Sequence, residues 1–499
     1  MVIKNGMLSC VEDEDIENGT FIIPINVHII DKDAFNCNTE LESITIPSNI
    51  KMIGDCAFES CPNLKTVNFS EGLEHIGDDA FTYCANLEHV VLPDSLQEIG
   101  CGAFQYCENL RSINIPRNVK KISSNIFDAC VHLETVKIYE GVEIIDSEAF
   151  FECKSLKEIN LPETLKEIGE DAFYGCETLR NITIPSGVKK ISDGAFSLCY
   201  LETIVISEGV EEIGDYVFSG VHNMSLPLSL KKIGKFGFSC CTNNSIVLPE
   251  GIDRIEEGMF FACKNIESID IPEGVKYIDN EAFECCSNLK SINIPEGVLG
   301  INYNAFKDCE NIENVTIPST VKFIGECAFE GCTNLKTIEI LSRNISIHPN
   351  SIDQHTTVIM PNDYLIVDST LVFINSPAIV DGEFIVPNGI ERLVDDVFRN
   401  CRKELKSVIL SPDVRDLGMN AFKDCENLER IELSKGIVKI EKGTFCNCIS
   451  LESIIIPDSV TYIDTGSFTN CINLKTVEIS MNTTIKAGAF DKGTTITVR

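Results

Sequence analysis

The chain has 499 residues, of which 44% are hydrophobic and 23% charged, a composition typical of a folded protein and not of a disordered one. Its 76 acidic residues outnumber 41 basic ones and give a formal net charge of −35, which repels phosphate backbones and anionic lipid headgroups. We therefore expect neither nucleic acid nor a membrane surface as a partner. No stretch approaches 18 apolar residues, so we expect no membrane span, and the N-terminus lacks the basic and then apolar pattern of a secretory signal.

The first predicted element is a short apolar pair, VIKNGMLS at Val2–Ser9, which we interpret as part of a hairpin-like cap over residues 1–20. A similar pair, IVDSTLVF, recurs at Ile366–Phe373. The segment that follows it, Asp381–Phe398, matches Asn18–Phe35 almost position for position. The two similar modules predict that the chain contains two repeat arrays, each begun by its own opening module.

A repeat of 23 residues dominates the rest of the chain, and one phenylalanine, here the ladder phenylalanine, marks each unit. The spacing contracts after Phe196, returns to 23 at Phe283, and is interrupted for 69 residues after Phe329. The ladder phenylalanines are Phe35, Phe58, Phe81, Phe104, Phe127, Phe150, Phe173, Phe196, Phe218, Phe238, Phe260, Phe283, Phe306, Phe329, Phe398, Phe422, Phe445, Phe468 and Phe490.

Each unit predicts one strand and one turn. The run Leu110-x-x-Ile113-x-Ile115 alternates as a short strand does, and Pro116 ends it because proline lacks the amide of a central strand. The residues around the ladder phenylalanine fall near helical spacing, which predicts one or two helical turns. One unit cannot bury its apolar face alone, whereas stacked units share a continuous core. The pattern therefore predicts an α/β repeat solenoid with a parallel sheet.

The units resemble the BspA-like (Treponema pallidum-type) leucine-rich repeats, with the pattern AF-x-x-C-x-x-L-x-x-I-x-I-P-x-x-V-x-x-I-G. Ala103, Phe104, Cys107 and the run Leu110–Val119 carry this pattern in one unit, and Ala328–Ile338 carries most of it in another. The resemblance implies a right-handed leucine-rich-repeat solenoid with the parallel sheet along its concave face. It also implies adhesion to host proteins, attachment or coaggregation, and therefore a place at the cell surface.

On this basis we expect four parts along the chain. Residues 1–20 form the cap, residues 21–340 the first leucine-rich-repeat array, residues 341–383 irregular repeats with the second opening module, and residues 384–499 the second array. The sequence leaves open whether residues 341–383 are a hinge or a rigid insert.

Cysteine occupies one slot of the repeat, three residues after the ladder phenylalanine. Sixteen of the 24 cysteines lie there, and we interpret them as buried thiols that act as small apolar residues. In one unit the slot holds Val221, which fits a need for a small apolar side chain and not for a disulfide. The sixteen are Cys61, Cys84, Cys107, Cys130, Cys153, Cys176, Cys199, Cys241, Cys263, Cys286, Cys309, Cys332, Cys401, Cys425, Cys448 and Cys471.

No catalytic, metal or cofactor motif is expected. Cys446-x-Cys448 lacks a second cysteine pair at the spacing of a zinc site, and the seven histidines share no slot of the repeat. His348 and His355 lie in the irregular segment with Asp353 nearby, which a surface loop explains more simply than an active site. We therefore predict that the chain is not an enzyme and uses no cofactor. A ligand pocket within residues 341–383 would favour the enzyme hypothesis.

The better candidate site is the outward face of the predicted strands. The third and fifth positions of Leu-x-x-Ile-x-Ile point away from the core and are often Ser, Thr or Asn, which offer hydrogen bonds to an extended protein or glycan. The same residues also stack well in parallel sheets, and this structural interpretation stays open. The candidate partner-binding residues are Ser43, Thr45, Thr66, Asn68, Ser112, Asn114, Asn160, Asn181, Thr183, Ser291, Asn293, Asn314 and Thr316.

The functional prediction is a noncatalytic, monomeric protein that binds other proteins or glycans. Cell-surface adhesion to host or extracellular proteins is the first hypothesis. The alternative is an intracellular interaction scaffold or effector, in keeping with the absence of a recognisable signal or anchor and with a cytoplasmic location.

Overall fold

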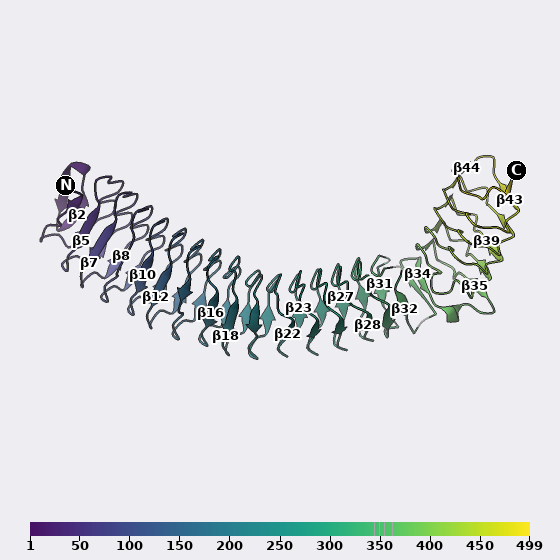
Figure 1. Cartoon of the computed structure of the whole chain (residues 1–499), viewed down its shortest axis with the longest axis horizontal. Helices are drawn as coiled ribbons and strands as arrows, with labels where there is room; N and C mark the ends of the chain where they lie inside the picture. The colour runs from purple at the N-terminus through teal and green to yellow at the C-terminus, as the bar shows by residue number, and fades with distance from the viewer. Residues whose placement is uncertain (344, 349, 354, 362) are drawn as a thin grey trace. The chain divides into compact units, whose positions relative to one another are not determined.

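The computed structural model describes residues 1–343, 345–348, 350–353, 355–361 and 363–499. The chain folds into two compact units, Met1–Gly297 with Asp308–Glu310 and Val298–Lys307 with Asn311–Arg499. In each unit the chain winds in successive coils whose strands stack side by side (Figure 1). The predicted fold class, a leucine-rich-repeat solenoid with parallel sheets, is confirmed.

One strand of each coil, here called the face strand, comes from the Leu-x-x-Ile-x-Ile run. Face strands of neighbouring coils pair in parallel, so that Ser112 aligns with Thr135 and Ile115 with Ile138. In the first unit the face strands are β3 (Thr20–Phe21), β5 (Ser43–Ile46), β7 (Thr66–Phe69), β10 (Ser112–Ile115), β12 (Thr135–Ile138), β14 (Glu158–Ile159), β16 (Asn181–Ile184), β18 (Thr203–Ile206), β20 (Asn223–Ser225), β22 (Ser245–Val247), β24 (Ser268–Asp270) and β26 (Ser291–Asn293). In the second unit they are β28 (Asn314–Ile317), β30 (Thr337–Ile340), β32 (Thr357–Ile359), β35 (Glu383–Ile385), β37 (Ser407–Ile409), β39 (Arg430–Glu432), β41 (Ser453–Ile455), β43 (Thr476–Ile479) and β45 (Thr495–Val498).

A second strand of only two residues follows in most coils, at the isoleucine before the turn. It too pairs in parallel from coil to coil, as Lys121 with Ile144 and Ile122 with Ile145. In the first unit these strands are β4 (Ile29–Ile30), β6 (Met52–Ile53), β8 (His75–Ile76), β9 (Glu98–Ile99), β11 (Lys121–Ile122), β13 (Ile144–Ile145), β15 (Glu167–Ile168), β17 (Lys190–Ile191), β19 (Glu212–Ile213), β21 (Lys232–Ile233), β23 (Arg254–Ile255) and β25 (Tyr277–Ile278). In the second unit they are β27 (Gly300–Ile301), β29 (Phe323–Ile324), β31 (Ser346–Ile347), β36 (Arg392–Leu393), β38 (Asp416–Leu417), β40 (Lys439–Ile440), β42 (Tyr462–Ile463) and β44 (Thr484–Ile485).

The two segments predicted to open the arrays are both antiparallel hairpins. β1 (Val2–Lys4) pairs antiparallel with β2 (Met7–Cys10), and β2 in turn pairs in parallel with β4. In the same way β33 (Tyr364–Val367) pairs antiparallel with β34 (Thr370–Ile374), which in turn pairs in parallel with β36. The two segments are therefore similar in structure as well as in amino-acid sequence. The division into two arrays around residues 341–383 stays a prediction.

The segment around each ladder phenylalanine is a run of turns and not the one or two helical turns that the spacing predicted. Asp79 and Tyr83, two residues before and after Phe81, have φ of 54° and 61°, which a right-handed helix cannot include. The amide of Phe81 donates to the carbonyl of Ala103 in the next coil at 2.8 Å, whereas the amide of Cys84 donates to Phe81 within its own coil at 3.1 Å. Amides thus alternate between local and inter-coil bonds.

Helix is confined to two short 3₁₀ turns, Asp13–Asp15 and Ser376–Ala378, in the described part of the chain. No described helix has the length and apolar character needed to cross a membrane.

The core is a stack of ladder phenylalanines. The rings of Phe58 and Phe81 lie 5.0 Å apart and 4° from parallel, and the same arrangement recurs along both units. Both rings are fully buried, which stabilises the fold by about 1.5–3 kcal/mol for each side chain. Because each ring packs between its neighbours, the core continues from coil to coil and needs no helical layer.

Candidate functional site

The structure places all thirteen predicted binding residues on the outer side of the face strands, here called the strand face. Ser43, Ser112 and Asn114 are half-buried and the other ten are exposed. Parallel pairing aligns Ser43 with Thr66 and sets like polar side chains into columns. The exposed residues are Thr45, Thr66, Asn68, Asn160, Asn181, Thr183, Ser291, Asn293, Asn314 and Thr316. Their role in binding stays a prediction.

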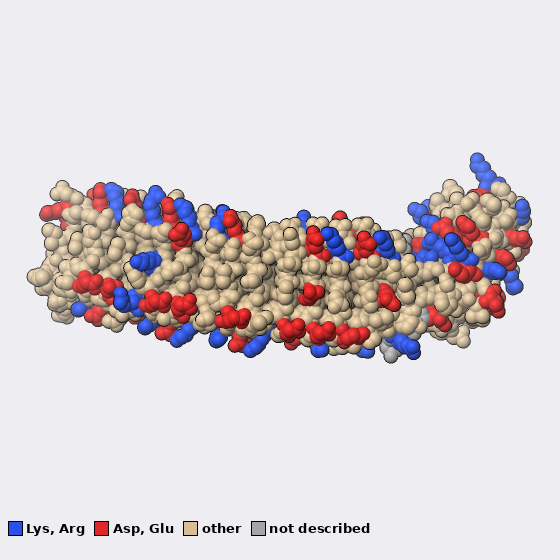
Figure 2. Space-filling model, turned by 60° about the horizontal axis from the view of Figure 1, so that its bottom comes forward, with Lys and Arg blue, Asp and Glu red and all other residues tan. Residues whose placement is uncertain are grey.

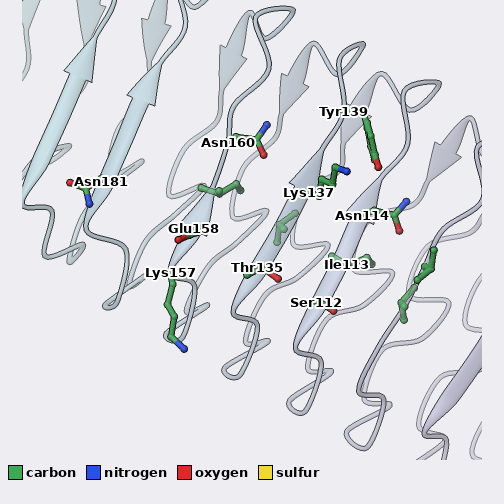
Figure 3. Close-up of a pocket in the computed structure, with 14 residues that line it drawn as sticks. Ser112, Ile113, Asn114, Thr135, Lys137, Tyr139, Lys157, Glu158, Asn160 and Asn181 are labelled. Atoms are coloured by element: carbon green, nitrogen blue, oxygen red, sulfur yellow. The ribbon is translucent and has the colours of Figure 1, made fainter.

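A groove of about 730 Å³ crosses the strand face of the first unit (Figure 3). It brings together four predicted residues, Ser112, Asn114, Asn160 and Asn181. The other residues that line it are Val90, Val91, Ile113, Thr135, Val136, Lys137, Tyr139, Lys157, Glu158 and Ile159.

The charged and aromatic members of the groove were missed by sequence reasoning, which followed only Ser, Thr and Asn. Lys137 stands at the fifth position of the Leu-x-x-Ile-x-Ile run, and its ammonium lies 4.4 Å from the centre of the Tyr139 ring. Glu158 stands at the third position of the next run, in β14, which pairs with β12. The signal in the sequence was a charge at a position that is mostly uncharged in neighbouring units.

Two of the predicted residues have a structural role. The Asn114 side chain accepts a hydrogen bond from the Leu92 amide at 2.8 Å and donates one to the Leu92 carbonyl at 3.0 Å. The face segment of this coil forms no strand in the described structure and pairs with its neighbours through isolated bridges at His89, so the Asn114 side chain replaces part of a strand ladder. Asn160 similarly donates to the carbonyl of Ile138 at 3.4 Å. The structural interpretation therefore applies to Asn114 and Asn160.

Alternating charges border the strand face. Glu134 lies between Lys157 at 2.8 Å and Arg111 at 3.4 Å, and these two cations, Lys157 first, lower the pKa of its carboxyl. Figure 2 shows a broad band with few charged side chains between rows of acidic and basic side chains over the first unit. Equivalent inter-coil pairs join Lys65 to Glu42, Arg180 to Glu202, Lys290 to Glu267 and Lys336 to Glu313. Because these charges neutralise each other, the band offers hydrogen bonds without a dominant charge.

The cysteine slot is confirmed as a series of buried, free thiols. The structure adds a bond that the sequence did not reveal, since most of these thiols donate to the carbonyl of the ladder phenylalanine in the preceding coil. Cys153 lies 3.2 Å from the carbonyl oxygen of Phe127. Burial raises the pKa of Cys286 to about 12, so the thiol stays protonated and unreactive at neutral pH.

Two groups of described side chains have the spacing to hold an ion. They are Asp33 with Cys56 and Glu59, and Glu284 with Cys285 and Asp308, and the ligand atoms of each lie within 4.8 Å of one another. Burial, with Glu59 as a second cause, raises the pKa of Cys56 to about 11, which disfavours the thiolate that a metal binds.

A second cavity, of about 510 Å³, lies in the second unit and includes part of residues 341–383. His348 and Asp353, which the sequence placed in a surface loop, both line it, as does Cys327. His348 Nδ1 accepts the Asn350 amide at 3.3 Å, whereas Asp353 accepts the Gly331 amide at 2.9 Å.

The cavity lacks the features of an activated nucleophile. Burial and Glu330 raise the pKa of Cys327 to about 11, so the thiol is protonated at neutral pH. No hydrogen bond joins Cys327 or Asp353 to His348 among the residues that the structure describes. A nucleophile next to its general base would need such a bond.

Comparison with known protein families finds the BspA type leucine-rich repeat region in six matches, over residues 13–133, 74–202, 121–225, 189–313, 300–360 and 372–497. A search of curated proteins finds no match.

Several solved structures are similar to the chain. A leucine-rich cell surface protein from Faecalibacterium prausnitzii is 28% identical, with 63% of this chain and 83% of that chain covered and a TM-score of 0.36. A leucine-rich repeat protein from Bacteroides ovatus is 22% identical over 96% of this chain and 94% of that chain, with a TM-score of 0.31. The T. pallidum leucine-rich repeat protein is 26% identical over 39% and 77%, with a TM-score of 0.26. The repeat matches extend over nearly the whole sequence, and the chain belongs to the BspA-type leucine-rich repeat family.

Proposed function

We propose that the chain is a noncatalytic binding protein that holds an extended segment of another protein on the strand face, and that it acts at the cell surface as an adhesin. The observation that carries the proposal is the groove of about 730 Å³, which spans several face strands and is lined by outward side chains. Family membership supports a binding role, since repeat proteins commonly bind partners along such surfaces.

The chemistry of the groove favours a protein segment over a glycan. Lys137, Lys157 and Glu158 offer both signs of charge, which suits a peptide with mixed side chains. The Tyr139 ring is approached by the Lys137 ammonium, so it is not a free platform for stacking a sugar. Asn181 adds an exposed amide that can bond a peptide main chain.

Binding of the full chain to a panel of immobilised extracellular matrix proteins tests the first part. We expect Lys137→Ala and Tyr139→Ala to weaken binding by roughly five-fold or more, the loss typical of a residue central to an interface. The matched control is Lys190→Ala, an exposed lysine on β17 outside the strand face, which should leave binding unchanged. Equal binding by all three variants would place the partner elsewhere on the protein.

Surface proteolysis of intact cells, with fractionation in parallel, tests the adhesin role. Cleavage on intact cells supports display at the surface. Full protection, with the protein in the cytosol and its thiols free, would replace adhesion by the alternative of an intracellular scaffold or effector.

A further inference from the structure

The cavity of the second unit contains an arginine that forms no ion pair or hydrogen bond with the described residues. Arg399 follows ladder Phe398 directly, and its guanidinium lies over the Phe373 ring, 4.6 Å from the ring centre. Its Nε and Nη2 atoms are buried and have no hydrogen-bond partner in the described part of the chain. Burial lowers the pKa of Arg399 to about 10, as expected for a cation that has lost its water and gained no close anion.

The neighbouring arginine, Arg402, differs from Arg399 because it forms ion pairs. Arg402 pairs with Asp396 at 2.7 Å and with Asp424 at 3.4 Å. The carboxylate nearest in sequence to Arg399 is therefore already bound to another guanidinium. Asp353, the other acid that favours the charged form of Arg399, accepts an amide at 2.9 Å from Gly331.

Other groups that line the cavity can donate to an anion. Arg392 comes from β36, where its Nε pairs with Asp416 at 3.2 Å, and His348 comes directly after β31. Thr370, on β34, donates its hydroxyl to the Asp368 carbonyl at 3.4 Å. Because His348 accepts the Asn350 amide at Nδ1, its Nε2 carries the proton and is a donor. An imidazole and a second guanidinium therefore line the same space as Arg399.

We propose that this cavity binds a carboxylate, held by Arg399 with support from Arg392 and His348. A buried cation is costly unless an anion pairs with it, and guanidinium and carboxylate match each other in a two-bond geometry. The volume of about 510 Å³ admits a group the size of an amino acid side chain or a small dicarboxylic acid. The cavity also holds Asp395 and Glu330, which select against a dianion of higher charge density such as phosphate.

Isothermal titration of the full chain tests this assignment with four probes in a chloride buffer: sodium glutamate, sodium succinate, inorganic phosphate, and an end-blocked hexapeptide with one central glutamate. We expect one site per chain for at least one carboxylate probe. Arg399→Met should weaken it roughly 10- to 100-fold, the loss expected for hydrogen bonds to a charged group. The matched control, Arg415→Met, removes an exposed arginine of the same unit and should bind as the parent does.

The probes also distinguish the source of the carboxylate. Binding of glutamate or succinate but not of the hexapeptide identifies a small molecule, and the reverse identifies a side chain of a partner protein. Arg399→Lys keeps the charge and loses the paired donors, so it should bind weakly while remaining folded by circular dichroism. The assignment is overturned if no carboxylate probe binds, if phosphate alone binds, or if Arg399→Met and Arg399→Lys bind as the parent does.

Discussion

The thiol of Cys130 lies 3.1 Å from the main-chain carbonyl oxygen of Phe104 in the preceding coil. The same carbonyl accepts the amide of Cys107 at 3.2 Å, so it keeps a partner when the thiol is removed. We therefore expect Cys130→Val to cost less than about 1.5 kcal/mol, as for a buried swap of similar volume. Urea unfolding followed by circular dichroism measures this difference.

The contrasting variant is Cys130→Asp, which buries an unpaired charge in the same slot and should cost at least about 3 kcal/mol. A cost of Cys130→Val as large as that of Cys130→Asp would mean that the thiol bond itself, and not the small apolar volume, holds the coils together.

High pH should unfold the protein steeply. Burial raises the pKa of Cys286, Cys401 and Cys471 to about 12, against an ordinary value of 9.0. The unfolded chain loses these protons first, so stability that is fully present below about pH 9 falls as the pH rises toward 12, by about 1.4 kcal/mol per unit and thiol. In a variant whose eight cysteines outside the repeat slot are replaced by serine, thiolate absorbance should appear together with the loss of circular dichroism. Its appearance while that variant is still folded would contradict the prediction.

Replacing Asn114 separates structure from binding on the strand face. Asn114→Ala removes both hydrogen bonds to the Leu92 main chain. It should lower the free energy of unfolding by about 1–3 kcal/mol, because the amide and carbonyl of Leu92 lose their partner. Asn68 occupies the same column and is exposed, so Asn68→Ala should change stability by less than about 0.5 kcal/mol. Thermal melts of both variants check the prediction, and equal costs would show that the Leu92 bonds do not matter.

Asp128 should limit stability at neutral pH. Burial, with Glu148 and Glu152 as further causes, raises the pKa of this carboxyl, and the residue is only 8% exposed. Ionisation of Asp128 is thus less favourable in the folded state than in the unfolded state. The stability that the protonated carboxyl contributes is therefore lost as the pH rises through the raised pKa. Asp128→Asn keeps an oxygen for the Gln105 amide, 2.6 Å away, and should raise the melting temperature at pH 7.

The gain from Asp128→Asn should disappear in acid, where Asp128 is protonated in both states. Asp94→Asn, at an exposed aspartate, is the control and should leave the melting temperature unchanged at both pH values. A gain that persists in acid would assign the effect to something other than the charge.

The repeat made much of the fold predictable. Ladder residues such as Phe104, Cys107 and Ile113 occur at fixed spacing, and all three are fully or nearly fully buried. The turn conformation was not predictable from spacing, because the residues at its left-handed positions include Asp79 and Tyr83, which share no chemical type. What they share is a main-chain amide that donates a hydrogen bond to the next coil, and periodicity within one unit carries no information about that hydrogen bond.

The binding surface was predictable by position and less so by residue type. The alternation of the strand identified the outward positions, including Asn114 and Asn181, which the groove contains. Lys137 and Tyr139 were missed because they depart from the consensus, and a consensus hides the individual units that build a specific site. Arg399 could not be found at all from the sequence, since its lack of a partner depends on how Arg402 uses Asp396.

The inter-coil bonds also bear on how such a chain can fold. The Phe81 amide donates a hydrogen bond to the Ala103 carbonyl, and Lys65 forms an ion pair with Glu42. The interaction partners of a coil therefore lie about one repeat away in sequence. The loop that must close to form a new coil is therefore short and of constant length, and its entropic cost does not grow as the chain lengthens. Contacts of this range favour rapid growth from any coil that forms first. Coils emerging from the ribosome can accordingly dock one after another, before the remainder of the polypeptide has been synthesised.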